Sequence, residues 1–567
     1  MSDVQKSLAA VLHRAAERLR GTPLQISLAE RLEGLANQVH QPCVVAVVGR
    51  VKVGKSTFVN ALLGEDLAKV GTTETTATIN YFSFGEPADP DRPVRCHWRG
   101  GNITDESREF LDGLQGNDLE TLQRADGIDH LEYFLPNPLL KQITLVDTPG
   151  TGAVVEEHES RTAEFIRLNN QLRDRHDQDT RQLGDTADAV IYLVGQVAKV
   201  SDQAFLQEFS QTTGDRASAL NAIGVLSKIE LQPEVLLRRH ELSAKIADQL
   251  KDGLNTVIPV AAGAHRALDQ LLEDDRAGLK QMMTTLRRIP PETLEMLLDA
   301  EEFFCDLDFP DSPVGPDERR GLLAGMKWGV FTTIARVAAD PRLNLDEVVA
   351  RLEEISGFSP LWEVLSRHFI QRGHILRCYR IASDAQEILN EIRYVHLPAL
   401  RREGNRESVR LEAFLDFIRR PGGDAEVAAD LEDFVRDHLD AGRRVGELEA
   451  LRAELEAELG TLLTLLLEYN DDFEVLQKLE DPRGEFSEAE LAELRPLLGL
   501  YGGEIEKRLP PGSANAEYVG WRQMYWGRRR AEAEYGTIEF AVADQAYTRY
   551  GLLLEEVLSE VPGEPGG

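Results

Sequence analysis

The sequence has few cysteines, and their spacing suggests neither a metal site nor a disulfide framework. Its 567 residues include four cysteines, and none of them forms a CxxC pair. Zinc ligation and disulfide stapling are therefore both disfavoured. A reducing cytoplasm is the compartment we expect. The four cysteines are Cys43, Cys96, Cys305 and Cys378.

Long apolar runs are also missing. No stretch reaches the roughly 18 uninterrupted apolar residues that a membrane-spanning helix needs. The nearest, residues 321–339, is interrupted by Lys327 and Arg336, and it fits either a buried core helix or a hairpin that touches a membrane. Residues 1–20 carry charges where a signal peptide would be apolar, so we expect a mature helix there rather than export.

Positive charge is scarce relative to negative charge. The 63 Lys and Arg residues stand against 97 Asp and Glu residues, which gives a formal net charge of -34. Such a charge repels nucleic acid and anionic lipid at long range. We therefore expect no nucleic-acid partner, and contact with any polyanion would need a local basic patch. The length suggests roughly two to four domains.

The chain changes character at about residue 264. Residues 2–40 show helical spacing of apolar residues, and residues 43–262 alternate short β-rich runs with amphipathic helices. This alternation predicts an α/β domain with a mostly parallel sheet and helices on both faces. Beyond residue 264 long amphipathic helices predict a large all-α region. The β-rich runs are CVVAVVG, TATINYFSF, IDHLEYFL, KQITLVD, ADAVIYLVG, LNAIGVLS and NTVIPVA.

One predicted helix of the second half carries a leucine stripe. Leucines recur there at spacings of three and four, which places them on one face with Glu and Arg around it. The stripe fits packing within one helical bundle, and it also fits a coiled coil between chains. The leucines are Leu448, Leu451, Leu455, Leu459, Leu462 and Leu466.

Residues 49–57, GRVKVGKST, form a GxxxxGK[ST] loop between an apolar strand and a helical segment. The glycines let main-chain N–H groups wrap a β-phosphate, and the helix start adds partial positive charge. Lys55 reaches the β- and γ-phosphates, and Ser56 can ligate magnesium. The nucleotide-binding residues predicted in this loop are Gly49, Val53, Gly54, Lys55, Ser56 and Thr57.

A second motif, ITLVDTPG, ends a predicted strand in Asp147. A carboxylate at the carboxyl end of such a strand can hold the magnesium shell through water, and the Gly150 amide is placed to sense the γ-phosphate. Taken alone, DTPG could equally be an ordinary turn. Its position about ninety residues after the phosphate-binding loop favours the functional interpretation.

Between these motifs lies a threonine-rich loop, GTTETTATI at residues 71–79. A threonine hydroxyl that completes the magnesium shell and a carbonyl that holds the attacking water are the usual demands on a switch loop. Several threonines compete for the role. The structural alternative is that they simply favour extended backbone.

The base-reading element is predicted in LNAIGVLSKIE, which supplies Ser227, Lys228 and Glu230. A carboxylate can accept the paired N1–H and N2–H edge of guanine, while the Lys228 stem can lie over the ring. Glu230 is one methylene longer than the commoner Asp, so an ATP-binding module stays an alternative. The run VIPVAAGA, residues 257–264, ends a strand in small residues such as Ala261 that can approach a purine.

Together, GRVKVGKST, the Thr75–Thr78 run, DTPG, SKIE and VIPVAA resemble the dynamin superfamily, specifically bacterial dynamin-like proteins. The motifs cover residues 40–265, and the rest of the resemblance is architectural. It implies a P-loop GTPase domain that hydrolyses GTP with Mg²⁺. The switch threonine would be Thr76, which with the Gly150 amide would organise the water. The magnesium residues would then be Ser56, Thr76 and, through water, Asp147.

The chain departs from the family at the fourth position of the loop. Many dynamins carry a serine there that helps to bind a charge-compensating monovalent cation, and this chain carries Lys52. The Lys52 ammonium could supply positive charge to the reaction directly, or it could point into solvent. The resemblance to the family therefore does not imply that a monovalent cation stimulates GTP turnover by this chain.

The resemblance also implies a domain order. It comprises N-terminal helices over 1–40, a G domain over 41–265, a helical bundle or stalk over 266–527, and a C-terminal helix over 528–567 that returns to the bundle and ends in a disordered tail. Helices from 2–40, from just after 264 and from 528–560 would join next to the G domain.

The leading hypothesis is a GTPase whose G domains pair or assemble, acting as a peripheral protein on a membrane. Lipid contact is expected through 321–339 or through 521–530, WRQMYWGRRR, whose aromatic and basic side chains suit a membrane interface. These aromatics could instead dock into the bundle. The alternative function is a GTP-gated scaffold that recruits a protein partner through its acidic helical half.

Overall fold

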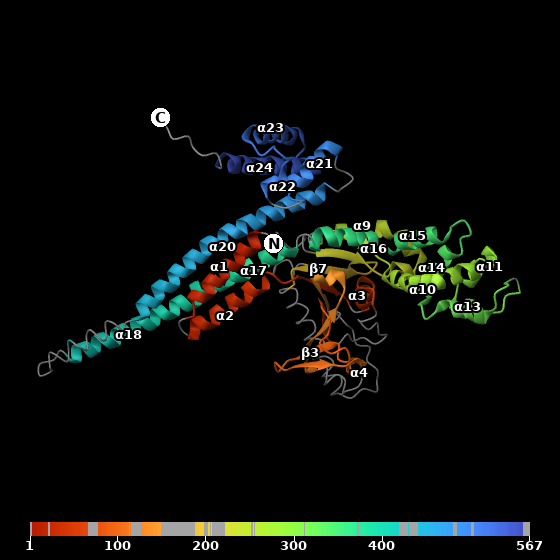
Figure 1. Ribbon diagram of the computed structural model, residues 1–567, viewed down its shortest axis with the longest axis horizontal. Coiled ribbons are helices and arrows are strands. Elements are labelled where there is room, and N and C mark those ends of the chain that lie inside the picture. Colours follow the sequence, from red (N-terminus) through yellow and green to blue (C-terminus); the bar gives the residue numbers. More distant parts are fainter. Residues whose placement is uncertain are drawn as a thin grey trace. The chain divides into compact units, whose positions relative to one another are not determined.

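The computed structural model shown in Figure 1 contains two compact units. Pro42–Leu376 form one, which we call the sheet unit, and Met1–Gln41 with Arg377–Gly567 form the other, which we call the helical unit. The structure describes residues 3–20, 23–50, 52–65, 78–112, 114, 126–148, 187–197, 202–204, 206, 222–250, 253–254, 256–310, 312–370, 373–418, 429, 440–479, 485–500 and 504–559.

A nine-stranded sheet organises the described part of the sheet unit, in the order β4-β3-β5-β2-β6-β1-β7-β8-β9. Among the described strands, five pairings are parallel and three are antiparallel. The prediction of a mostly parallel sheet is confirmed. The strands are β1 (Cys43–Gly49), β2 (Ile79–Phe84), β3 (Val94–Trp98), β4 (Ile103–Glu106), β5 (Ile128–Leu135), β6 (Ile143–Asp147), β7 (Ala189–Val194), β8 (Ala222–Leu226) and β9 (Val257–Pro259).

Helices cover both faces of this sheet, as predicted. They include α3 (Lys55–Leu63), α8 (Pro233–Leu237), α9 (Arg239–Gln249), α10 (Ala262–Leu286), α11 (Pro291–Leu297), α12 (Glu301–Cys305), α13 (Pro316–Leu323), α14 (Trp328–Ala338), α15 (Leu345–Ser356) and α16 (Phe358–Leu365). Successive β1 side chains point to opposite faces. Val47 lies in one apolar core with Phe58 of α3, and Val48 lies in another with Phe331 of α14. Because both faces are buried, β1 is apolar throughout.

Helices α10 to α16 belong to the sheet unit. We expected the G domain to end at 265 and the following helix to join the terminal helices in a bundle. In the structure α10 instead buries Ala264 and Leu271 in the same core as Val48. The division between the units accordingly falls at Leu376. The physical reason is that this face of the sheet needs an apolar cover, and α10 with the helices after it provides it.

The stretch 321–339 is a core helix rather than a membrane hairpin. Most of it forms α14, whose side chains Phe331, Ile334 and Ala335 are fully buried. A lipid bilayer therefore has no access to the apolar face of this stretch. Among the helices that the structure describes, none is both long and apolar enough to cross a membrane.

Long helices build the helical unit, and Figure 1 shows α1 and α18 alongside α20. The leucine stripe faces inward, with Leu459 and Leu466 fully buried, as the packing alternative within one bundle requires. On its flank Arg14 pairs with Glu458 at 2.8 Å. The helices are α1 (Asp3–Arg18), α2 (Pro23–Gln38), α17 (Gly373–Glu391), α18 (Leu397–Ile418) and α20 (Asp440–Lys478).

Four further helices surround the C-terminal part of α20. Trp526 is fully buried among them, and its Nε1 donates to Glu493 at 3.0 Å. Arg522 also donates to Glu493. In the 521–530 stretch, therefore, Trp526 docks into the bundle, whereas Trp521 is 57% exposed. The helices are α21 (Glu488–Leu497), α22 (Ile505–Arg508), α23 (Ala516–Glu532) and α24 (Ile538–Ser559).

Candidate nucleotide-binding site

The phosphate-binding loop follows β1 and turns sharply into α3. Its backbone has positive φ at three positions, 155° at Gly49, 63° at Lys52 and 108° at Gly54. A Cβ at Gly49 would lie 2.6 Å from the carbonyl oxygen of Leu193, so a larger residue does not fit. Gly54 caps the N-terminus of α3 in the left-handed conformation, which glycine adopts without strain. The loop therefore presents backbone N–H groups and the positive end of a helix to one point.

Lys55 lies beneath this loop. Its Nζ donates to the Gly49 carbonyl at 3.0 Å and to the Arg50 carbonyl at 3.2 Å. The side chain is buried, and burial lowers the pKa of Lys55 to about 8, although the nearby Asp147 carboxylate acts in the opposite direction. A phosphate oxygen would give this desolvated ammonium an anionic hydrogen-bond acceptor in addition to the two carbonyls.

Asp147, at the end of β6, meets the start of α3. Ser56 Oγ donates to Asp147 Oδ2 at 3.3 Å, and the carboxyl group is fully buried. Burial raises the pKa of Asp147 to about 6, against the opposing effects of Lys55 and Ser56. Its Oδ1 has no hydrogen-bond partner within the described residues. A hydroxyl beside an unsatisfied buried carboxylate is a set of oxygen donors that suits magnesium.

The segment after β8 is clamped onto the phosphate-binding loop. Ser227 Oγ donates to the Val53 carbonyl at 2.7 Å, and Lys228 Nζ donates to the Lys52 carbonyl. Lys228 has a φ of 61°, an uncommon conformation that turns the chain here. Its Cε would lie 3.3 Å from a Cβ at Gly54, so its stem passes directly over the loop.

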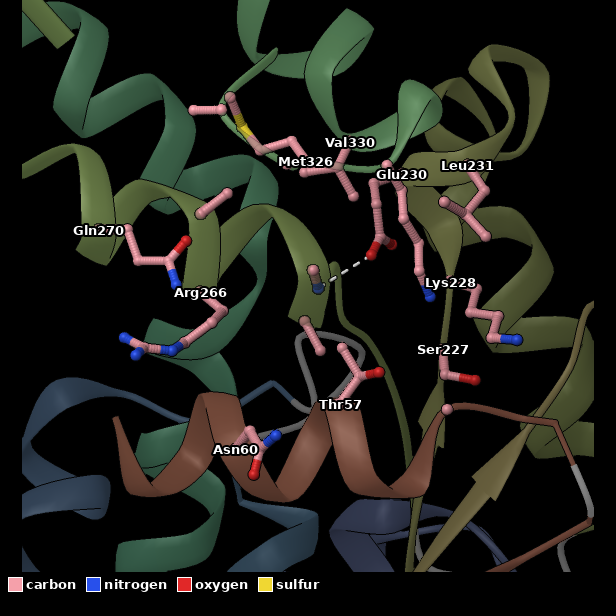
Figure 2. Close-up of a pocket in the computed structure, with 17 residues that line it drawn as sticks. Thr57, Asn60, Ser227, Lys228, Glu230, Leu231, Arg266, Gln270, Met326 and Val330 are labelled. Atoms are coloured by element: carbon pink, nitrogen blue, oxygen red, sulfur yellow. Dashed lines mark hydrogen bonds between the residues drawn. The ribbon is translucent and has the colours of Figure 1, made fainter. Parts of the chain in front are cut away.

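Glu230 is almost completely buried, with 4% exposure. Its Oε1 accepts a hydrogen bond from the Gly263 amide at 2.9 Å, which Figure 2 shows as a dashed line. Its Oε2 is buried and has no partner among the described residues. Burial raises the pKa of Glu230 above its usual range, and hydrogen bonds from backbone amides partly offset this. One carboxylate oxygen is thus left to receive a donor from a ligand.

These segments line one cavity of about 330 Å³. In Figure 2, Thr57 and Asn60 approach it from α3, while Arg266 and Gln270 approach it from α10. The sequence analysis did not predict Asn60. It lies three residues after Thr57, and this helical spacing could have placed both side chains on the same face of α3. The full lining is Gly54, Thr57, Asn60, Ser227, Lys228, Glu230, Leu231, Ala262, Gly263, Arg266, Ala267, Gln270, Ala324, Gly325, Met326, Lys327 and Val330.

Not every predicted residue lines this cavity. Five of them do, namely Gly54, Thr57, Ser227, Lys228 and Glu230, whereas the lining does not include Gly49, Lys52, Val53, Lys55, Ser56, Asp147 and Ala261. Ala261 lies behind its wall, where its amide donates to the Ser356 carbonyl at 2.9 Å, and its neighbours Ala262 and Gly263 face the cavity in its place. Thr76 and Gly150 lie outside the described residues. The Lys52 side chain is exposed, and its carbonyl serves Lys228.

Known proteins resemble this chain most clearly over its sheet unit. Residues 45–229 match the sequence model of the dynamin family. The isoniazid-induced protein IniC of Mycobacterium tuberculosis is 27% identical over 391 residues, which cover 65% of this chain and 72% of IniC. A bacterial dynamin-like protein of Nostoc punctiforme is 27% identical over 171 residues, which cover 26% of this chain and 24% of that protein.

A solved structure of an oligomerised bacterial dynamin pair, described as sensing and tethering membranes, covers 97% of this chain and 90% of its own. Its identity to this chain is 14% and its TM-score is 0.29. The matched residues 45–229 carry the assignment, because they include Lys55, Asp147 and Lys228, which the structure gathers at one site. Residues 45–229 therefore form a dynamin-family GTPase domain, and the chain is similar to bacterial dynamin-like proteins.

Proposed function

We propose that the chain binds GTP with Mg²⁺ in the cavity beside the phosphate-binding loop and couples its hydrolysis to self-association on a lipid membrane. One observation carries the nucleotide part of the proposal. Buried Lys55 and Asp147 lie with partly buried Ser56 beside a loop that lines a cavity, and the Glu230 carboxylate, whose Oε2 has no partner among the described residues, lines the same cavity. Phosphate chemistry lies at one end of this cavity and base recognition lies at the other.

Each residue of the phosphate end has a distinct role. The Lys55 ammonium binds the β- and γ-phosphates, and Gly49, Val53, Gly54 and Thr57 belong to the loop and helix start that present N–H groups to them. Ser56 and Asp147 would hold the magnesium ion, which when bound neutralises charge that develops on the phosphates. Thr76 and the Gly150 amide are proposed to orient the attacking water. Lys52 is proposed to add positive charge there.

The base end is proposed to read guanine. Glu230 Oε2 lacks a donor, and the N1–H and N2–H edge of guanine supplies donors. The Lys228 stem, held over the loop by the Lys52 carbonyl, is positioned to cover the ring. Ser227 keeps this segment in register with Val53. Adenine offers an amino group and an unprotonated N1 along the corresponding edge, which a carboxylate accepts less well.

Membrane contact is proposed through α18. Val409, Phe414 and Phe417 on this helix are 65%, 46% and 64% exposed. At the angular spacing of an α-helix they fall within about 140° of its circumference, so they can enter one interface together. The stretch 521–530 offers less, because Trp526 is buried and Arg522 is bound to Glu493.

The acidic character of the chain favours a second candidate function. A net charge of -34 opposes anionic lipid. A scaffold that binds GTP and recruits a basic protein partner through the helical unit would tolerate this charge better than a membrane-bound enzyme. Lipid binding separates the two functions, since the scaffold needs none.

The decisive experiment measures GTP turnover against protein concentration, with and without liposomes, beside the Lys55→Ala variant. We expect Lys55→Ala to lose nucleotide binding, and ATP to compete far less well than GTP for the wild type. Specific activity should rise with protein concentration and with lipid. Retained binding by Lys55→Ala would refute the site, flat specific activity would refute self-association, and liposomes that never pellet the protein would favour the scaffold.

A further inference from the structure

The turn between α13 and α14 forms a wall of the proposed nucleotide cavity. Ala324, Gly325, Met326 and Lys327 line the cavity together with the phosphate-binding loop and the Glu230 segment. This turn lies well beyond residues 45–229, which match the dynamin family, and none of the motifs in the sequence points to it. Figure 2 shows Met326 and Val330 facing the cavity across from Thr57.

Helix α14 is fixed to the base-reading segment, so this wall has a defined position. Thr333 Oγ1 donates to the Glu230 carbonyl at 3.0 Å. A Cβ at Gly329 would lie 2.8 Å from Leu231 Cα, which shows how closely the helix approaches that segment. The turn before α14 is therefore held at the same edge of the cavity as the Glu230 carboxylate.

The turn has an unusual backbone that directs Lys327. Ala324 has a φ of 45° and Gly325 a φ of 79°, and the Met326 amide donates to the Leu323 carbonyl at 2.7 Å. A left-handed alanine costs on the order of 1 kcal/mol. The chain reverses within these residues and resumes as α14 after Lys327, which caps that helix with extended backbone. Such strained conformations cluster at ligand-binding sites.

A guanine base needs a hydrogen-bond donor for its 6-oxo group, and the nearby backbone donors are mostly occupied. Three amides of the segment after β9 donate to protein acceptors at 2.9 Å each. Their acceptors are the Leu226 carbonyl, the Ser356 carbonyl and Glu230 Oε1. The occupied amides belong to Val260, Ala261 and Gly263.

Two lysines lie within electrostatic reach of Glu230, and of these Lys327 is the one without a hydrogen bond among the described residues. Lys228 donates to the Lys52 carbonyl. Lys327, which lines the same cavity, makes no hydrogen bond or ion pair within the residues that the structure describes. Both ammonium groups counteract the burial that raises the pKa of Glu230, which places Lys327 within electrostatic reach of this carboxylate.

We propose that Lys327 determines base specificity by donating a hydrogen bond to the 6-oxo group of guanine, while Glu230 Oε2 accepts from the adjacent N–H edge. The inference rests on the proposed binding of GTP in this cavity. Adenine carries an amino group at the same position, so the ammonium would meet a donor instead of an acceptor. Lys327 and Glu230 together thus recognise a base that carries an acceptor, the 6-oxo group, next to a donor, the N–H edge.

The test compares GDP with 2-aminopurine riboside diphosphate, which keeps the 2-amino group and lacks the 6-oxo group together with the N1–H. Dissociation constants are measured by calorimetry for the wild type, for Lys327→Met and for Lys245→Met, a matched loss of one exposed charge on α9. We expect Lys327→Met to weaken GDP binding about 10-fold or more, as the loss of a charge-assisted hydrogen bond does. Binding of the 2-aminopurine analogue should not change, and Lys245→Met should match the wild type for both ligands.

The possible failures are distinguishable. If Lys327→Met leaves GDP binding unchanged, or weakens both ligands equally, the specificity role is refuted while GTP binding itself stands. If the wild type binds neither ligand, the proposed function fails and the inference fails with it. Circular dichroism of Lys327→Met confirms folding, and because the side chain is exposed we expect no change in the melting temperature.

Discussion

Lys55 and Asp147 are two buried charged groups beside the phosphate-binding loop. For each of them, burial shifts the pKa more than the charge of the other group does. Burial lowers the pKa of Lys55 to about 8 and raises the pKa of Asp147 to about 6. For both groups, therefore, the charged form is less favourable than it would be in water. Nucleotide and magnesium would relieve this cost, because each brings the opposite charge to one of the two groups. This gives the site an affinity that depends on pH.

Magnesium-dependent nucleotide binding should weaken as the pH falls through about 6. A protonated Asp147 cannot serve the magnesium shell, and a group with a raised folded-state pKa binds its proton below that value. Proton competition then reduces the affinity by up to tenfold per pH unit, as expected for a ligand that must be deprotonated. The measurement is the dissociation constant of a fluorescent GDP analogue between pH 5 and 8, with magnesium and with chelator.

Asp147→Asn provides the control for this experiment. The variant should bind the magnesium nucleotide weakly at every pH and lose the acid limb, since it has no proton to release. Equal pH profiles in magnesium and in chelator would contradict the role of Asp147.

At the level of elements, the site depends on how closely α10 approaches the Glu230 segment. Gly263 permits this approach, because a Cβ there would lie 2.7 Å from Glu230 Oε1 and 2.9 Å from Val330 Cγ2. The same residue donates its amide to that oxygen. A glycine at the second position of a helix is a local cost that a close contact explains.

Gly263→Ala should therefore displace the Glu230 carboxylate and weaken GDP binding about 10-fold, in line with overpacking penalties of about 1–3 kcal/mol. Gly460→Ala in α20 is the matched control, since a Cβ there meets nothing within 4 Å. That control should gain about 1 kcal/mol in the free energy of unfolding, as expected for alanine in a helix, and leave GDP binding unchanged. Calorimetric titration and thermal unfolding measure both effects, and an unaltered affinity in Gly263→Ala would show that the contact can relax.

A buried ionic cluster joins three helices of the helical unit. Asp472 of α20 accepts from Arg508 at 2.8 Å and from Arg549 Nε at 3.0 Å, and Gln545 donates to it at 2.8 Å. Asp472 and Arg508 are almost completely buried. Removing the Asp472 carboxylate would take a buried anion away from both guanidinium groups, and Arg549 would keep only its pair with Glu468 at 3.2 Å among the ion pairs of the described residues.

Asp472→Asn should accordingly lower the free energy of unfolding of the helical unit by about 3–5 kcal/mol, the range for a broken buried ion pair. Asp544→Asn, which breaks the half-exposed pair with Arg530, should cost less than about 1 kcal/mol. Denaturant unfolding of the full chain followed by tryptophan fluorescence compares the two. A similar loss in the free energy of unfolding in both variants would contradict a special contribution of the buried cluster to stability.

For the molecule as a whole, strong local patterns predicted the fold and the phosphate end of the site. The buried parallel strands are continuous apolar runs, and the loop from Gly49 to Ser56 has the GxxxxGK[ST] spacing that predicts phosphate binding. Strands β3 and β4 escaped prediction because they pair at the sheet edge and carry polar residues such as Arg95 and Asp105. Strand β3 also pairs with β5, which begins only at Ile128, after β4 and a short helix.

The base end of the site was predictable only in part. Ser227, Lys228 and Glu230 follow a recognisable strand, but Lys327 belongs to a turn that tertiary packing brings to the cavity. No motif in the sequence connects Lys327 with the Glu230 segment. For the same reason sequence alone placed α10 with the terminal helices, whereas its apolar face completes the core over the sheet.

The two candidate functions of the whole molecule differ in what the exposed apolar residues of α18 do. If they enter a bilayer, replacing Val409, Phe414 and Phe417 together by serine removes about 1.5–3 kcal/mol per side chain, so liposome binding should fall at least 100-fold. Their exposure means that folding and basal GTP turnover should be retained. The matched control replaces Trp521 and Met524, which are 57% and 68% exposed on α23, and should keep lipid binding. Loss of liposome binding in the control alone would indicate that α23, and not α18, contacts the membrane. A wild type that never pellets with liposomes would favour the GTP-gated scaffold as the function.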